Sequence, residues 1–191
     1  MARVFNHSGA CPCCAGGERV VPRRVAVAAG LGLLFGGPAL AQGAATRSLS
    51  VRRFFTGDSF SGVYWRDGAY DREALRRLDF VFRDLSAEET TPMDPRLFDV
   101  LHAVARAVDA TEAYEVISGY RSPETNAMRA QTSSRVSEVS LHMSGMAADC
   151  RIPGRQAIGM ARLAADMRLG GVGLYRRDGF VHLDCGPVRR W

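Results

Sequence analysis

Two histidines and one aspartate have the residue types and the spacing of a catalytic metal site. His142 and Asp149 lie seven positions apart in the stretch 140–151, and His182 follows close to the C-terminus. Two imidazoles and one carboxylate are a ligand set of catalytic zinc, which leaves the fourth position to water. The sequence therefore predicts that His142, Asp149 and His182 hold one zinc ion.

The spacing by itself also fits a site without metal. In that interpretation His142 caps a loop, Asp149 pairs with an arginine and His182 is a hydrogen-bonded core histidine. Gly145 favours the metal, because a glycine lets the backbone turn back and bring a loop histidine towards a strand aspartate. His102 sits beside the apolar stripe of a predicted helix, and we expect it to be a partly exposed helical histidine.

The residues around these side chains predict the elements that must position them. Residues 49–55 and 60–65 have strand composition and are separated by a Gly-Asp-Ser break, which predicts a hairpin. Asp71 can cap a first helix. Asp94, followed by proline in the first turn, predicts the start of a second helix.

The second half of the chain alternates short strands and helices. A strand at 114–118 is followed by a helix that begins at Ser122. Tyr120 and Arg121 lie at the turn between them, and loops often carry functional side chains. The predicted fold class is α+β, with helices packed on a small, mainly antiparallel sheet and the metal on one face of that sheet. The remaining predicted elements are a polar, mobile loop at 132–139, a strand at 146–152, a helix at 155–169 and a hairpin of strands 170–175 and 180–185.

Four short motifs occur in order along the chain. They are Ser-Gly-Tyr-Arg-Ser-Pro-Glu-Thr-Asn at 118–126, Ser-x-His-x-x-Gly-x-Ala-x-Asp at 140–149, Gly-x-Gly-x-Tyr at 171–175 and Phe-Val-His-x-Asp at 180–184. Together they resemble the zinc D-Ala-D-Ala metallopeptidase superfamily, and most closely its murein endopeptidase K group. Segments 67–70 and 93–97 look like that group too, so the resemblance covers nearly all of the chain after residue 41.

The resemblance implies a hedgehog/D-Ala-D-Ala peptidase-like fold and a zinc hydrolase that acts on peptidoglycan stem peptides in the periplasm. It assigns the two histidines and the aspartate named above to the metal. Arg121 is similar to the arginine that contacts the substrate or the developing oxyanion. Tyr120, beside it, and Ser140 are expected to join Arg121 in binding the substrate.

The resemblance leaves the general base open. Many relatives carry an acid three residues before the last ligand, or a His-x-His, where this chain has Gly179 and Phe180. Asp184 follows His182 by two residues on the same strand face, roughly 7 Å away. We expect it to act as the base or to orient an imidazole. The alternatives are that Asp184 pairs with Arg189 or Arg190, and that Asp178 or Glu138 is the base.

Three functions fit this set of residues. The first is an endopeptidase that hydrolyses stem-peptide cross-links in murein, with a carboxylate that takes the proton of the attacking water. The second is a D,D-carboxypeptidase that trims terminal D-Ala. The third is a non-hydrolytic, zinc-stabilised cell-wall binding module. The sequence does not separate them.

Composition bounds the partners. The chain has 191 residues, a formal net charge of +5 and a pI near 9.3. All 25 basic residues are arginine, which either favours carboxylate and phosphate partners or reflects codon bias. No arginine-rich helix or basic tract with interleaved aromatics appears, so nucleic acid is not an expected partner. We expect a monomer that binds peptidoglycan peptides.

The first 41 residues predict a leader. Arg23-Arg24 precede an apolar run at 25–37, and Ala-Leu-Ala ends at Ala41, as in a signal peptide. The paired arginines suggest the twin-arginine route. The run is too short to span a membrane. We expect an exported, periplasmic protein in which residues 42–191 form a single zinc peptidase-like domain with no integral membrane part.

The cysteines fall into two groups. Cys11, Cys13 and Cys14 lie in the leader beside His7, without the regular spacing of a zinc site. Cys150 and Cys185 lie in predicted strands and point away from the ligand face. In an oxidising compartment they either form a disulfide that joins the two ligand strands or remain as two buried free thiols. The sequence leaves both possibilities open.

Overall fold

The computed structural model describes residues 45–133, 137 and 139–191. The predicted signal peptide, the leader cysteines and Glu138 lie outside the described residues, as does part of the predicted loop at 132–139. Among the described residues, no helix is long and apolar enough to cross a membrane.

One mixed sheet organises the described residues. Its strands are β1 (Thr46–Arg53), β2 (Ser59–Arg66), β3 (Ala69–Tyr70), β4 (Tyr114–Ser118), β5 (Ala147–Arg151), β6 (Gly171–Tyr175), β7 (Phe180–Asp184) and β8 (Arg189–Arg190). Their order across the sheet is β3-β2-β1-β4-β5-β7-β6-β8. The pairs β1–β4 and β6–β8 are parallel and the other five are antiparallel. This confirms the predicted α+β class with a mainly antiparallel sheet.

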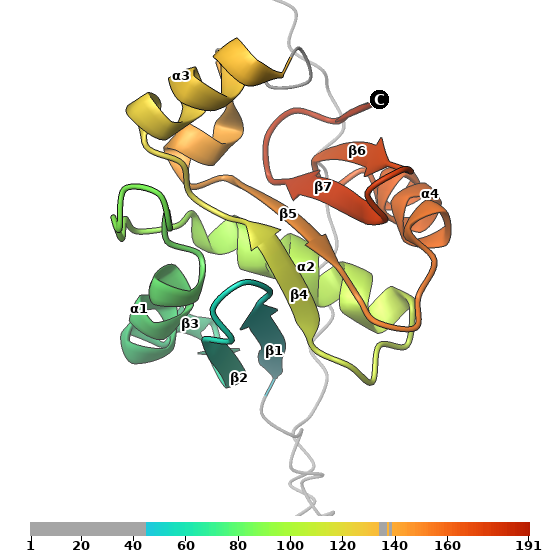
Figure 1. Cartoon of the computed structure of the whole chain (residues 1–191). Coiled ribbons are helices and arrows are strands. Elements are labelled where there is room, and N and C mark those ends of the chain that lie inside the picture. Colours follow the sequence, from blue (N-terminus) through green and yellow to red (C-terminus); the bar gives the residue numbers. More distant parts are fainter. Residues whose placement is uncertain (1–44, 134–136, 138) are drawn as a thin grey trace, which may run out of the picture. The chain divides into compact units, whose positions relative to one another are not determined.

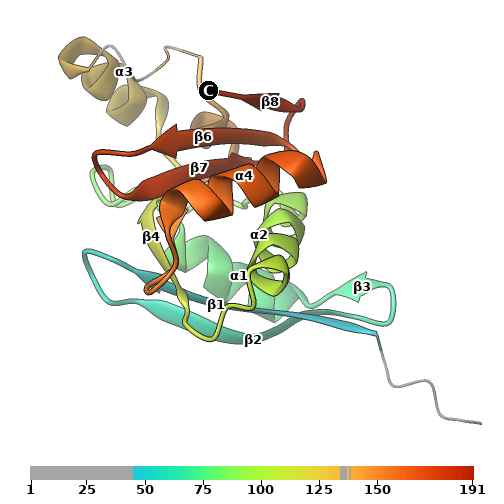
Figure 2. The same cartoon turned by 90° about the vertical axis from the view of Figure 1, so that its right-hand side faces the viewer.

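The helices are α1 (Arg72–Val81), α2 (Pro95–Ala107), α3 (Pro123–Thr132) and α4 (Ala157–Met167), with a 3₁₀ turn, η1 (Leu141–Ser144). Helices α1, α2 and α4 contact the sheet, and α2 passes behind β4 and β5 in Figure 1. Helix α3 stands beyond the end of β4, away from α1 and α2. Figure 2 shows α4 running alongside β6 and β7.

The predicted helix starts are confirmed. The carboxylate of Asp71 accepts hydrogen bonds from the amides of Glu73 and Ala74 at 2.8 and 3.0 Å. Asp94 caps α2 in the same way, and the hydroxyl of Ser122 accepts from the third residue of α3. Each cap satisfies amides that the first helical turn leaves unpaired.

The strands that carry the predicted ligands have two different faces. Val181 and Leu183 of β7 belong to the hydrophobic core, together with Cys150 of β5. Because side chains alternate along a strand, Asp149 and His182 point to the other face. The core between sheet and helices therefore fixes the position of the ligand face. The largest fully buried core side chains include Tyr64, Tyr114, Phe82, Phe98, Leu97 and Leu101.

A shift of register brings β4 into the ligand face. Val116 pairs with Cys150, but Ser118 pairs with Asp149, so the register moves by one residue between them. Simple alternation would place Ser118 on the core face with Val116. The irregularity instead places Ser118 beside Asp149.

Of the two alternatives for the cysteine pair, the structure has the free thiols. Cys150 and Cys185 are both free thiols, the first buried and the second partly exposed. Cys150 pairs with Val181 in the β5–β7 ladder, whereas the amide of Cys185 bonds to the carbonyl of Met146 at the other end. Four residues along a strand correspond to about 13 Å, far beyond the reach of a disulfide. The expectation that both cysteines lie on the face opposite the ligands is confirmed, and the register of the strands is what rules out the disulfide alternative.

Candidate metal centre and active site

His142 is presented by η1. The hydroxyl of Ser140 accepts the His142 amide at 3.3 Å, and Gly145 ends the turn with φ of 66°. That left-handed conformation suits glycine, as the sequence predicted. The Nδ1 of His142 donates to the carbonyl of Gly119 at 2.6 Å. This bond leaves Nε2 as the ring nitrogen that points into the site.

The other two predicted ligands lie on neighbouring strands. Asp149 of β5 and His182 of β7 are direct partners in the ladder. Asp149 Oδ1 lies 3.0 Å from His182 Nδ1 and 3.3 Å from His142 Nε2, and the two nitrogens are 3.2 Å apart. The structure thus brings all three together, each less than a tenth exposed.

This triangle has the dimensions of a zinc site. Tetrahedral bonds of about 2.0–2.1 Å place ligand atoms about 3.3–3.4 Å apart. One oxygen and two imidazole nitrogens at 3.0–3.3 Å from one another match that edge. Among the described residues, this is the group of three or more metal-ligating side chains that could hold an ion. The donor set fits zinc, with one position left open.

Asp184 lies behind His182. Its Oδ2 accepts a hydrogen bond from His182 Nε2 at 3.0 Å, and its Oδ1 accepts from the amides of Gly171 and Gly186 at 2.9 and 2.8 Å. Asp184 is fully buried and does not line the cleft at the triad. The carboxylate is therefore placed to orient the imidazole. Of the two roles expected for Asp184, this placement fits the orienting one, because the imidazole ring lies between the carboxylate and the donor atoms of the triad. The predicted pairing with Arg189 is also present, at 2.8 Å.

Arg121 holds Asp149, one of the three predicted ligands, in place. Its Nε donates to the hydroxyl of Ser118 at 2.9 Å, and its Nη2 pairs with Asp149 Oδ2. Asp149 is thereby held with Oδ1 towards the two histidines. Arg121 is 7% exposed and lines the cleft. Its guanidinium is therefore both a partner of Asp149 and part of the wall that a molecule bound in the cleft would face.

Burial and close contacts shift the pKa values of all three side chains of the triad. Burial raises the pKa of Asp149, but the charges and hydrogen bonds of His142, His182 and Arg121 outweigh burial and hold that pKa well below its usual range. Burial lowers the pKa of His142. Burial opposes charge on His182 too, but its bonds to Asp149 and Asp184 raise its pKa. Both ring nitrogens of His182 face carboxylate oxygens, and a metal ion at Nδ1 would take the place of one proton.

The triad opens into a cleft of about 630 Å³. Ser140 and Arg121 line it, as predicted for substrate-binding residues. Tyr120 does not: its side chain joins the hydrophobic core, and its hydroxyl lies 3.4 Å from Glu89. The cleft is also lined by Arg129, Met143, Tyr175, Asp178, Arg189 and Trp191.

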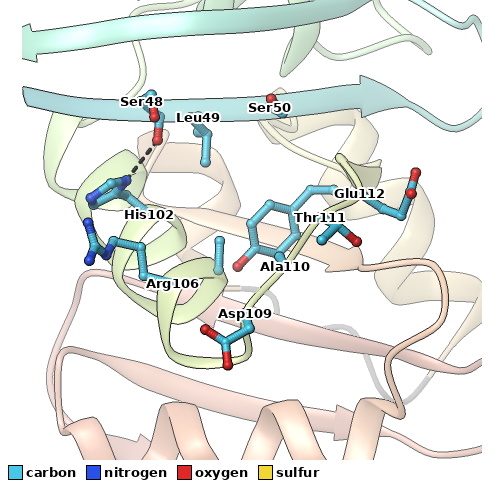
Figure 3. A pocket seen from close by; sticks show the side chains of 11 residues that line it. Ser48, Leu49, Ser50, His102, Arg106, Asp109, Ala110, Thr111 and Glu112 are labelled. Carbon is cyan, nitrogen blue, oxygen red and sulfur yellow. Dashed lines mark hydrogen bonds between the residues drawn. The ribbon is translucent and has the colours of Figure 1, made fainter.

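His102 lies in a different pocket, of about 380 Å³, between β1 and the end of α2. Figure 3 shows its ring against the backbone of β1, where Nδ1 bonds to the carbonyl of Ser48 at 2.7 Å. The prediction of a partly exposed helical histidine is confirmed.

Three contacts of the site were not predicted. The carbonyl of Gly119 accepts a hydrogen bond from His142, and the hydroxyl of Ser118 accepts one from Arg121. Both residues belong to the Ser-Gly-Tyr-Arg motif, in which the sequence pointed only to Tyr120 and Arg121 as functional side chains. Trp191 packs on His182. Because β8 is only two residues long, its composition gives no strand signal, and nothing in the sequence placed Trp191 near the predicted ligands.

Comparison with known proteins agrees with this geometry. The family model described as peptidoglycan L,D-endopeptidase MepK, Peptidase_M15_2, matches residues 41–191. A Haemophilus influenzae protein named "Probable peptidoglycan L,D-endopeptidase MepK" is 38% identical over 146 residues, 76% of this chain and 78% of its own. The peptidoglycan L,D-endopeptidase MepK of Escherichia coli K12 is 37% identical over 145 residues, 76% of this chain and 80% of its own. No solved structure gives a significant match. The chain belongs to the Peptidase_M15_2 family, that of peptidoglycan L,D-endopeptidase MepK.

Proposed function

We propose that this protein is a zinc-dependent peptidoglycan endopeptidase that hydrolyses stem-peptide cross-links. The observation that carries the proposal is the triangle of His142 Nε2, His182 Nδ1 and Asp149 Oδ1, with sides of 3.0–3.3 Å, inside a cleft. The names of the relatives specify an L,D-endopeptidase. The cross-link bond between an L-centre and a D-centre is therefore the expected target.

The metal ligands are proposed to be His142, Asp149 and His182. A zinc ion held there would lower the pKa of its water and polarise the scissile carbonyl. Each ligand has an outer partner that fixes its donor atom: the carbonyl of Gly119, the guanidinium of Arg121 and the carboxylate of Asp184. Such partners set ring orientation and ligand basicity.

Asp178 is proposed as the general base. Apart from Asp149, it is the carboxylate among the described residues that lines the cleft. It lies on the turn between β6 and β7, four residues before His182. An exposed carboxylate at the rim can take a proton from the attacking water and pass it to the leaving amine.

Two arginines are proposed to hold the substrate. Arg121 faces the cleft beside Asp149, where it can stabilise the oxyanion of the tetrahedral intermediate. Arg129 of α3 lines the same cleft and is exposed. Stem peptides carry free carboxylates, which a guanidinium binds with two hydrogen bonds. Arg129 therefore gives the cleft a contact for peptide carboxylates that is separate from the bond cleaved.

The cell wall is the proposed place of action. Peptidoglycan lies outside the cytoplasmic membrane, and the leader predicted at 1–41 supplies an export signal, with twin arginines at 23–24. The proposed mature form is a single domain, residues 42–191, and the match of the family model to residues 41–191 supports it.

Mass-spectrometric profiling of muropeptides tests the function. Purified sacculi are incubated with the zinc-loaded protein, with the His182→Ala variant and with a matched His102→Ala variant. We expect wild type and His102→Ala to convert cross-linked dimers into monomers, with cleavage at the L,D bond. Loss of terminal D-Ala alone would replace the proposal by a carboxypeptidase. No change with a zinc-loaded wild type would favour a binding module.

A further inference from the structure

The two glycines of the Gly-x-Gly-x-Tyr motif, Gly171 and Gly173, lie against the side chains of Arg189 and Trp191. The proposed mechanism gives these two side chains no role. A Cβ atom at Gly171 would lie 2.3 Å from Asp184 Oδ2 and 2.7 Å from Arg189 Nη1. A Cβ atom at Gly173 would lie 2.6 Å from the ring of Trp191. All three distances are shorter than a non-bonded contact of a Cβ atom allows. The motif thus leaves room for Arg189 and Trp191.

Strand β8 delivers these two side chains to the ligand face. It pairs in parallel with β6, and the pairing continues at Trp191, whose amide donates to Val172 at 3.2 Å and whose carbonyl accepts from Leu174 at 3.1 Å. Arg189 and Trp191 are two residues apart and share one face. The Arg189 guanidinium lies 5.1 Å from the centroid of the Trp191 ring, within cation–π range.

Arg189 and Trp191 both restrain His182, Arg189 through Asp184 and Trp191 by direct contact. Arg189 pairs at 2.8 Å with Asp184, which accepts the hydrogen bond of His182 Nε2. The Trp191 ring packs on the imidazole itself, with centroids 5.1 Å apart and planes tilted by 51°. One contact fixes where Nε2 points, and the other limits rotation of the ring. Nδ1 is left facing Asp149 and His142.

We propose that Arg189 and Trp191 form a clamp that holds the imidazole of His182 at the metal-binding angle, and that Gly171 and Gly173 are its seat. The clamp rests on the proposed zinc site and adds two positioning residues to it. Trp191 also lines the cleft and a neighbouring groove formed by α4 and β6. Its ring therefore forms part of the wall between the cleft and this groove.

A purely structural role makes a different prediction. Trp191 is 55% exposed, so its removal takes little apolar surface out of the core and should change the melting temperature little. Positioning groups around metal ligands, in contrast, typically change metal affinity by about 10- to 100-fold when removed. Metal affinity and thermal stability of the metal-free protein therefore separate the two roles.

Competition with a chromophoric zinc chelator tests the clamp. We expect Trp191→Ala and Gly173→Ala to bind zinc about 10-fold or more weakly than wild type, with Trp191→Phe recovering most of the loss because a ring remains. Gly159→Ala is the matched control, since a Cβ there meets open space and should leave affinity unchanged. Circular dichroism of each metal-free variant checks folding, and Trp191→Ala decides alone if Gly173→Ala does not fold.

Fluorescence gives a second measure without turnover. The chain has two tryptophans, so Trp65→Phe leaves Trp191 as the sole one. Zinc should change its emission, and His182→Ala should abolish the change. A wild type that binds no zinc would contradict the proposed metal site. A wild type that binds zinc, with Trp191→Ala and Gly173→Ala binding equally well, would overturn the clamp.

Discussion

His142 and His102 make the same local contact in two different hollows. Each donates Nδ1 to a backbone carbonyl, His142 to Gly119 at 2.6 Å and His102 to Ser48 at 2.7 Å. Around His102 the pocket also contains an arginine, acids and a tyrosine. The residue types of a hydrolytic site are thus present in both places.

The difference lies in what the other ring nitrogen faces. His142 Nε2 lies within 3.3 Å of a second imidazole nitrogen and of a carboxylate oxygen. The ring of His102 instead packs edge-on against the ring of Tyr64, with 6.3 Å between the two ring centroids. Each proposed ligand at the first site has an outer partner, whereas the acids at the second site, Asp109 and Glu112, are exposed. Convergence of donor atoms and a second layer of hydrogen bonds distinguish a metal site from a polar pocket.

Removing a histidine from each hollow should give the largest contrast. His182→Ala takes away one of three ligands, so zinc affinity should fall by more than the 10- to 100-fold typical of outer partners, and turnover should be lost. His102→Ala should keep both. Isothermal titration with zinc and muropeptide release measure the two effects. Equal loss in both variants would remove the distinction between the hollows.

Asp178→Asn should separate catalysis from metal binding. A carboxylate that only transfers protons affects turnover by about 10²- to 10⁴-fold and leaves zinc affinity at the wild-type level. Rates of muropeptide release and zinc titrations on the same preparation provide the check. Unchanged turnover would exclude Asp178 as the base.

Asp184→Asn should weaken zinc binding first and turnover only as a consequence. Asp184 has a pKa lowered to about 2, because its bonds to His182, Gly171 and Gly186 outweigh the burial that raises it. Losing its charge should weaken zinc binding by about 10- to 100-fold, and turnover should recover in part at saturating zinc. A variant with full zinc affinity but no turnover would instead make Asp184 a direct participant in catalysis.

Acidification should release zinc from the cleft. The pKa of His182 is raised by Asp149 and Asp184 against the effect of burial, and a proton on Nδ1 competes with the metal. Zinc affinity should be full above that raised pKa and fall by about tenfold per pH unit below it. In the metal-free protein the sign reverses: the stability contributed by protonated His182 is present at low pH and lost as pH rises through the folded pKa. Zinc release and melting temperature against pH measure the two trends. If zinc affinity and the stability of the metal-free protein changed with pH in the same direction, His182 would not be the group that controls both.

The smallest effect is expected from His102→Ala alone. It removes one hydrogen bond at a partly exposed site, worth about 1 kcal/mol. The zinc affinity and its pH profile should match wild type. Denaturant titration measures the loss, and any change in zinc binding would connect the two hollows.

The sequence predicted what local patterns and alternation control. Capping residues marked three helices, Gly145 marked the turn under His142, and period-two alternation put Asp149 and His182 on one face. Those local patterns could not predict the register of the sheet, because register depends on pairing between segments that are distant in the sequence. The separation of Cys150 from Cys185 and the shift that brings Ser118 to Asp149 are both register effects.

The direction of side chains at turns was the other feature that the sequence did not predict. Tyr120 and Arg121 are adjacent, but one turns into the core and the other to the cleft. Asp184 shared a face with His182 as predicted, yet the glycines of β6 allowed it and Arg189 to pack behind the imidazole. Those positions follow from tertiary packing, which no single segment encodes.

The coordination of zinc in the loaded protein is the most direct test. X-ray absorption at the zinc edge reports the ligand atoms and their distances. We predict one zinc per chain with two imidazole nitrogens and oxygen ligands at about 2.0–2.1 Å, and loss of one imidazole contribution in His182→Ala. A sulfur ligand, or the same spectrum in His182→Ala, would contradict a site built from His142, Asp149 and His182.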